Sequence, residues 1–204
     1  MKRRRSHQRL VIRNTGARLG AATCTPLMAA VLNLDAARTT GAALYLRGVL
    51  RGFDEVDARD PRARALLVRD AVNAAAVREL PLAIVCETPW GGHVSAALSL
   101  TATVALWRDT WLAMHGDPYR FIELQVGEWR RALFGKRSLS REQARIAEGL
   151  TARAQIRAEC PVLLRETLGP DAAAAVCMGA VTRRSSTVQE RLSCELIGMR
   201  KAHG

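Results

Sequence analysis

An aspartate closes the first strongly apolar segment of the chain. Asp35 follows the run VLNL at positions 31–34, and a second apolar run starts at residue 42. This pattern predicts that Asp35 stands at the end of a buried strand, where an ionised carboxylate is costly unless it has a partner. A bound divalent cation is one such partner, because hard cations take oxygen ligands.

Two later carboxylates occupy settings that would let them share this cation. Glu87 ends the apolar segment 82–86, and Asp171 follows Pro170 at the start of an alanine-rich segment. Three carboxylates around one crevice suit hard divalent cations, and two such ions about 3.5–4 Å apart activate water and stabilise the leaving oxygen of a phosphodiester. Each residue also has a simpler interpretation: Asp171 suits any helix start, and Glu87 suits a solvated strand end.

The pattern of apolar positions predicts three adjacent strands, followed by alternating helices and strands. The first three strands form an antiparallel meander, and the fourth, fully apolar strand pairs in parallel with the first. We therefore expect an α/β protein with a ribonuclease H-like mixed sheet, three antiparallel strands plus parallel strands, flanked by helices. The expected strands are 31–35, 42–47, 49–56, 82–86 and 119–125, and the expected helices start after Asp60-Pro61 and cover 94–115, 128–134, 141–159 and 171–181.

The charge distribution favours a polyanionic partner. The chain has 204 residues, which fits one domain, and carries a net charge of +12, with seven Lys or Arg and no acid in its first 30 residues. We divide it into a basic arm at 1–29, a folded domain at 30–181 and a basic tail at 182–204. This charge favours nucleic acid over a membrane as the partner, and no apolar run reaches the length of a membrane span.

Cysteine usage and the N-terminus bear on the compartment. The five cysteines are odd in number and widely spaced, and none forms a C-x-x-C pair. Free thiols of this kind indicate a reducing compartment. We expect a cytoplasmic protein, bacterial or phage-encoded. An arginine-rich N-terminus without acids is also typical of transit peptides, and organellar import is therefore the alternative.

Four segments in chain order resemble the RuvC-type Holliday junction resolvases, which are crossover junction endodeoxyribonucleases of the ribonuclease H-like superfamily. They are LNLDAARTTG at 32–41, IVCETPWGGH at 84–93, a stretch at 126–143 that contains WRRALFGK and SREQ, and DAAAAVCMG at 171–179. The resemblance implies that the folded domain at 30–181 is a nuclease domain.

The resemblance also implies site residues, a cofactor and partners. In this family an acid on each of three elements holds Mg²⁺, with Mn²⁺ as the alternative. Asp35, Glu87 and Asp171 are the implied catalytic residues and metal ligands. The implied partner is a four-way DNA junction, cut by a homodimer that associates through helix 94–115, although a helix buried in its own monomer has the same apolar stripe. The implied nucleic-acid contacts are Trp90, Arg38, Arg130, Arg131 and Lys136.

One departure from the family pattern leaves more than one function open. The last helix of this family usually carries two acids three residues apart, whereas Ala174 stands three residues after Asp171. We expect a metal-dependent, structure-specific endonuclease that resolves branched DNA by phosphodiester hydrolysis. The alternatives are a catalytically weakened or inactive module that binds branched DNA without cutting it, and a related nuclease for flaps, forks or RNA-containing hybrids.

Overall fold

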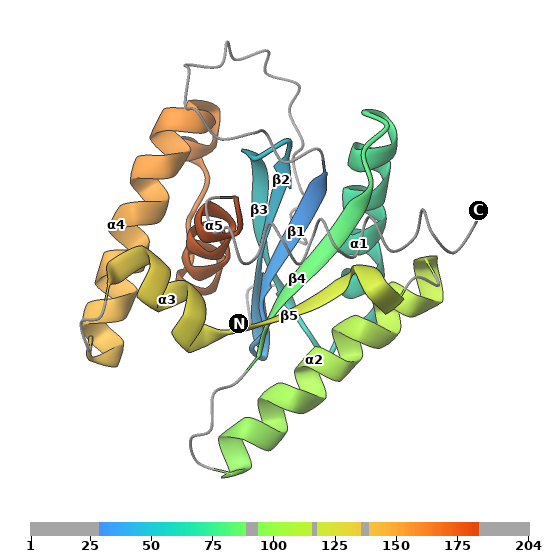
Figure 1. Ribbon diagram of the computed structural model, residues 1–204, viewed down its shortest axis with the longest axis horizontal. Coiled ribbons are helices and arrows are strands. Elements are labelled where there is room, and N and C mark those ends of the chain that lie inside the picture. Colours follow the sequence, from blue (N-terminus) through green and yellow to red (C-terminus); the bar gives the residue numbers. More distant parts are fainter. Residues whose placement is uncertain (1–28, 89–93, 116–117, 136–138, 184–204) are drawn as a thin grey trace, which may run out of the picture.

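A mixed sheet of five strands forms the centre of the structure, a computed structural model that describes residues 29–88, 94–115, 118–135 and 139–183. Helices cover both faces of this sheet (Figure 1). In chain order the elements are β1 (Ala30–Asp35), β2 (Thr39–Leu46), β3 (Val49–Asp57), α1 (Pro61–Ala76), β4 (Leu82–Thr88), α2 (Val94–His115), β5 (Phe121–Gln125), α3 (Val126–Phe134), α4 (Arg141–Glu159) and α5 (Pro170–Thr182).

The sheet combines antiparallel and parallel pairs in the order β3-β2-β1-β4-β5. β1 pairs antiparallel with β2, and β2 with β3, whereas the pairs β1–β4 and β4–β5 are parallel. A tight turn joins β2 to β3, with φ at 51° for Arg47 and 72° for Gly48, the geometry that two-residue hairpins require. The mixed ribonuclease H-like sheet predicted from the sequence is confirmed.

The main differences from the predicted elements lie at three boundaries. β2 starts at Thr39 rather than at residue 42, because residues 39–41 already pair with β3. β5 starts at Phe121 rather than at residue 119, because Pro118 opens a 3₁₀ turn in front of the strand. α3 starts at Val126, directly after β5, rather than at Glu128. The basic arm and the basic tail, apart from residues 29 and 182–183, lie outside the described residues.

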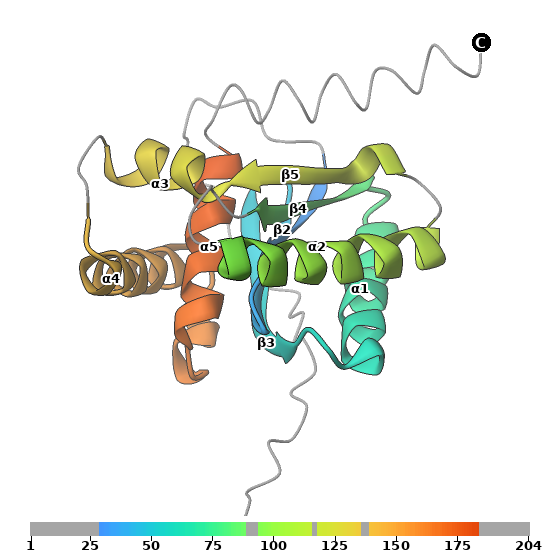
Figure 2. The same cartoon turned by 90° about the horizontal axis from the view of Figure 1, so that it is seen from below.

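The two faces of the sheet carry different helices. α3, α4 and α5 lie against one face, and α1 and α2 lie against the other (Figures 1 and 2). Alternation along β1 divides the core accordingly: Val31 shares a cluster with Val176 of α5, whereas Leu32 shares a cluster with Trp107 of α2. Among the described helices, none is both long and apolar enough to cross a membrane.

α5 is buried along almost its whole length, from Ala172 to Thr182. It comes into direct contact with β2 at Gly41, where a Cβ atom would lie 1.8 Å from the backbone oxygen of Asp171. Gly41 is also the residue of β2 that pairs with Asp35 of β1. The absence of a side chain at Gly41 therefore lets the first turn of α5 approach the end of β1.

A buried hydrogen-bond network holds the rest of α5 in place. The Tyr45 hydroxyl of β2 donates to the backbone oxygen of Val176 at 2.8 Å, and it accepts a hydrogen bond of 2.8 Å from Gln155 Nε2 of α4. Gly179 packs on the same ring, because a Cβ atom there would lie 2.0 Å from Tyr45 Cε2. β2, α4 and α5 are thus joined through one side chain.

The close approach at Gly41 can be tested by Gly41→Ala. The added methyl group would force α5 away from β2, so we expect the free energy of unfolding to fall by roughly 2–3 kcal/mol in urea denaturation. Gly149→Ala in α4 is the matched control: no atom lies within 4 Å of its added Cβ, and a helical Gly→Ala change should stabilise by about 0.5–1 kcal/mol. Equal stability of the Gly41→Ala variant and the wild type would contradict the packing.

Candidate active site

Asp35 and Glu87 leave the sheet side by side on the face that α3, α4 and α5 cover. Leu34 pairs with Cys86 in the parallel β1–β4 ladder, so the two acids occupy the next positions of adjacent strands. Val85, two residues before Glu87, belongs to the core beneath α4 and α5, and the alternation of side chains puts Glu87 on the same face. Parallel pairing thus delivers both carboxylates to one end of the sheet, where open α/β sheets place their sites.

Asp171 reaches the same region from the first turn of α5. The helix has no side-chain cap at Gly169; instead, Glu55 Oε1 of β3 accepts hydrogen bonds of 3.0 Å from the backbone N–H groups of both Asp171 and Ala172. Gly169 permits this contact, because a Cβ atom there would lie 2.1 Å from Glu55 Oε1. A carboxylate at a helix N-terminus is favourable, so Glu55 fixes the start of α5, a role that the sequence analysis did not predict.

The acids form one electrostatic unit around Asp35. Burial raises the pKa of Asp35 well above its ordinary value. The negative charges of Glu87, Asp171 and Glu148 raise this pKa further, in decreasing order. The guanidinium of Arg130 lowers it, though by less than the causes that raise it. Repulsion among partly desolvated carboxylates disfavours their ionised forms, so this part of the molecule is suited to receive a cation.

Glu87 has a buried hydrogen-bond donor that orients its carboxylate. Burial raises the pKa of Glu87 to about 7, while a hydrogen bond from Trp129 and the charge of Arg130 lower it. Trp129 Nε1 of α3 donates to Glu87 Oε2 at 2.7 Å, and the indole is fully buried at 0% exposed. Because a buried Trp ring has little freedom, this bond fixes one oxygen of the carboxylate.

A fourth carboxylate enters the site from α4, and the sequence analysis missed it. Glu148 is only 2% exposed, and its negative charge raises the pKa of both Asp35 and Glu87. The signal was present in the helix pattern: Ala144, Glu148 and Ala152 are buried and four residues apart, so they share one face. A glutamate on the inward face of a helix is an unusual choice for a core position.

The predicted phosphate contacts differ in their relation to the acids. Arg130 of α3 lies beside them, as its effect on the pKa of Glu87 shows. Arg131 is exposed on α3, and Arg38 is exposed between β1 and β2. Two further predicted nucleic-acid contacts lie outside the described residues, namely Trp90 and Lys136.

An arginine that the sequence analysis did not select also lies near the site. Arg145 is exposed on α4, and its charge lowers the pKa of Asp171 and of Glu148. For Asp171, burial and the negative charge of Glu55 outweigh this effect, so the pKa of Asp171 is raised. The acidic site is therefore bordered by cations on both α3 and α4.

The acids fit a divalent cation in chemistry, but their side chains do not converge on a single point. All four offer carboxylate oxygens, which suit Mg²⁺ or Mn²⁺. Within the described ranges, however, no three His, Cys, Asp or Glu side chains are grouped closely enough to hold a metal ion. Ligation of one cation by three of these acids therefore requires their side chains to move toward one another.

Ala174 occupies the position at which the resemblance leads one to expect a second acid on the last helix. Its side chain is 2% exposed and belongs to the core cluster of that face of the sheet. α5 thus supplies only Asp171, and the additional carboxylate of the site comes from α4. The two helices touch here, since Cys177 Sγ lies 3.3 Å from the backbone oxygen of Glu148.

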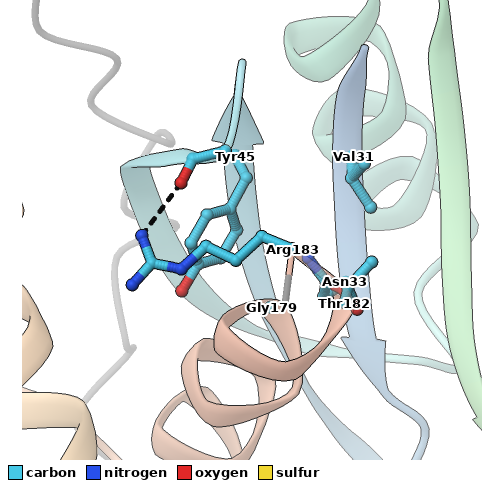
Figure 3. Close-up of a pocket in the computed structure, with 7 residues that line it drawn as sticks. Val31, Asn33, Tyr45, Gly179, Thr182 and Arg183 are labelled. Carbon is cyan, nitrogen blue, oxygen red and sulfur yellow. Dashed lines mark hydrogen bonds between the residues drawn. The ribbon is translucent and has the colours of Figure 1, made fainter. Parts of the chain in front are cut away.

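A small hollow at the C-terminal end of α5 differs from the acidic site in its lining residues (Figure 3). Within it the Thr182 hydroxyl donates to Asn33 Oδ1 at 3.1 Å. No carboxylate, cysteine or histidine is among its lining residues, so it offers no group for hydrolysis. The residues that line it are Val31, Asn33, Tyr45, Gly48, Gly179, Thr182 and Arg183.

Comparison with solved structures identifies the fold. The structure is similar to Thermus thermophilus RuvC in complex with a Holliday junction substrate, with a TM-score of 0.52 and 12% identity over 81% of this chain and 96% of that chain. A second structure of Thermus thermophilus RuvC matches with a TM-score of 0.47 and 16% identity, over 78% of this chain and 97% of the other. No family model and no curated protein matches the sequence. The chain has a RuvC-like fold.

The raised pKa of Glu87 predicts a pH-dependent stability that can be isolated with Glu87→Gln. A carboxyl group whose folded pKa is about 7, above its unfolded value of 4.5, stabilises the fold below its unfolded pKa and loses this contribution as the pH rises through 7. Metal-free wild type should therefore lose roughly 1–3 kcal/mol relative to Glu87→Gln between pH 5 and pH 8. The amide oxygen of the variant can still accept from Trp129.

The measurement is the free energy of unfolding of both proteins in urea at several pH values, with a chelator present. Subtracting the variant from the wild type removes the contributions of acids that do not interact with Glu87, and leaves that of Glu87 together with its coupling to Asp35. Parallel pH curves for the two proteins would show that Glu87 titrates normally.

Proposed function

We propose that this chain is a metal-dependent endonuclease that resolves branched DNA, four-way junctions above all, by phosphodiester hydrolysis. The observation that carries the proposal is the adjacency of Asp35 and Glu87 at the carboxyl ends of two parallel strands, with Asp171 beside them, in a RuvC-like fold. The net charge of +12 supports a polyanionic substrate.

Asp35, Glu87 and Asp171 would hold the cation, Mg²⁺ or Mn²⁺. A divalent cation at these residues would supply charge neutralisation and activation of water. In the hydrolysis the oxygen of water bonds to phosphorus, and the bond from phosphorus to the 3′ oxygen breaks. That oxygen takes up a proton, so each cut leaves a 3′-hydroxyl and a 5′-phosphate.

The protein's own groups orient the reaction. The hydrogen bond from Trp129 holds Oε2 of Glu87, and this also restricts the direction in which Oε1 points. Arg130, beside the acids, is suited to bind a phosphate next to the cut. The exposed residues Arg131 and Arg38 are suited to contact phosphates further from it. Trp90 and Lys136 stay predictions for the contact with the junction.

A homodimer through α2 would place two such sites on one junction. The inward face of α2, with Trp107 and Trp111 fully buried, packs on its own sheet. Its outward face leaves Leu98 65% exposed, together with Thr101 and Ala105. The monomer therefore does not use this apolar stripe, which supports a second copy as its partner.

A second candidate function is binding without cleavage. The observation that favours it is Ala174, since an acid expected there is missing and its site is closed by apolar packing. In that case the protein would bind four-way junctions tightly with or without a divalent cation. Cleavage gained by Ala174→Asp in an inactive wild type would assign the loss of activity to this position.

Cleavage of a labelled four-way junction in Mg²⁺ and in Mn²⁺ tests the proposed function. Wild type should cut paired strands, and Asp35→Asn should slow the cut by about 10²–10³-fold or more, because a metal-ligating carboxylate is lost. Asp70→Asn is the matched control, because Asp70 lies on α1 at the opposite face of the sheet. A junction left intact in both cations would contradict the nuclease proposal.

The same assay should include flaps, forks and RNA-containing hybrids of equal length. The proposed function predicts the highest rate on the four-way junction. A flap, fork or hybrid that is cut faster would favour a related nuclease with that specificity.

The dimer proposal predicts that Ala105→Arg converts the protein to a monomer. A long cation on the outward face of α2 would be buried without a partner in the dimer. Sedimentation velocity would measure the state of association. Val77→Asp is the control, because Val77 is 79% exposed but lies after α1. If the Ala105→Arg protein sediments like the wild type and like the Val77→Asp control, the outward face of α2 is not the dimer interface.

A further inference from the structure

Glu148 is a buried acid on a helix face that is otherwise without charge. It is 2% exposed on a face of α4 that otherwise carries Ala144, Ala152, Ile156 and Gln155, the last hydrogen-bonded to Tyr45. Burial raises its pKa, which means that keeping it ionised costs free energy. Because an apolar residue of similar volume usually stabilises such a position equally well or better, the carboxylate calls for another role.

Its partner is the guanidinium of Arg130. Arg130 Nε donates to Glu148 Oε1 at 2.8 Å. The side chain of Glu148 is 3% exposed, whereas that of Arg130 is 41% exposed. The ion pair therefore has a buried end that is held by α4 and an open end that solvent and ligands can reach.

Arg130 is held at a second point by its neighbour in α3. Its guanidinium carbon lies 5.1 Å from the ring centroid of Trp129, a cation–π contact. The ring of Trp129 is itself fixed by the bond to Glu87. The orientation of the guanidinium is thus set by Glu148 on one side and by an immobile ring on the other.

No hydrogen bond or ion pair with another described residue occupies the terminal amino groups of Arg130. Within the described residues, the hydrogen bond and ion pair of this guanidinium both go from Nε to Glu148. A guanidinium has five N–H donors, so four remain on the two Nη atoms. Their fork matches two oxygens of a phosphate. Because Arg130 also lowers the pKa of Asp35 and Glu87, a phosphate that approaches those acids would meet this fork.

We infer that Glu148 is a positioning residue: it holds Arg130 by Nε so that the terminal amino groups face the phosphate at the Asp35–Glu87 end of the sheet. The inference rests on the proposed nuclease function. Without the carboxylate of Glu148, Arg130 would be drawn toward the acids on which its charge already acts, Asp35 and Glu87. The arginine would then pair with the acids that the reaction needs, and it would no longer present a free fork to the substrate.

A double-mutant cycle between Glu148 and Arg130 tests this inference. In Glu148→Ala, the kcat for junction cleavage should fall by about 10–100-fold, because the lost interaction acts on the reacting phosphate. The Kd for the junction, measured in chelator, should change by less than about threefold. Arg130→Ala should lose at least as much. In the Arg130→Ala background, Glu148→Ala should lower kcat by less than about threefold more, since the two residues act as a unit.

Two further variants separate positioning from folding. Glu148→Gln keeps the shape and an acceptor for Nε but removes the charge, so it should retain part of the rate. Glu142→Ala removes an exposed glutamate of the same helix and should cleave like the wild type. The Nε–H resonance of Arg130 in a ¹H–¹⁵N spectrum without metal should be protected from exchange in the wild type and lost in Glu148→Ala.

The outcomes distinguish this inference from the proposed function. If wild type cuts junctions and Glu148→Ala cuts them at the same rate, or if the two substitutions are fully additive, the inference is overturned while the nuclease function stands. If wild type leaves all junctions intact, the nuclease function fails, and the inference fails with it.

Discussion

The structure is organised around the convergence of negative charge at one end of a parallel strand pair. Asp35 and Glu87 leave adjacent strands at the same end, and Asp171 and Glu148 approach from two helices. Their mutual repulsion and burial raise the pKa of Asp35, so the arrangement is unfavourable in itself. A fold that retains it must hold each acid by other contacts and must gain a function from their proximity.

Those contacts come from the sheet and from the helices α3, α4 and α5 that cover one of its faces. Gly41 lets α5 touch β2, and Glu55 of β3 caps the first turn of α5, so the position of Asp171 depends on two strands. α3 contributes Trp129 to Glu87 and Arg130 to Glu148. The RuvC-like fold thus supplies the scaffold, and these contacts set the orientation of the acids.

The sequence predicted the strands well, because long apolar runs are a strong local signal. It also predicted the start of α4, because Ser140 and Gln143 form a capping box. It also indicated Asp35 and Glu87, since an acid at the end of an apolar run is conspicuous. Glu148 was not predicted as a site residue, because its role depends on which face of α4 turns inward, and tertiary packing decides that. Glu55 was not predicted for a similar reason: it caps a helix that starts more than a hundred residues later in the chain.

We propose that Asp35, Glu87 and Asp171 together hold a divalent cation for phosphodiester hydrolysis. The most direct measurement is the anomalous diffraction of crystals of the protein soaked in Mn²⁺, with a four-way junction bound. We expect at least one manganese peak with oxygens of Asp35 and Glu87 as ligands, and the three side chains gathered around it. Saturating Mn²⁺ with no peak at these residues, or with peaks only elsewhere on the protein, would contradict it.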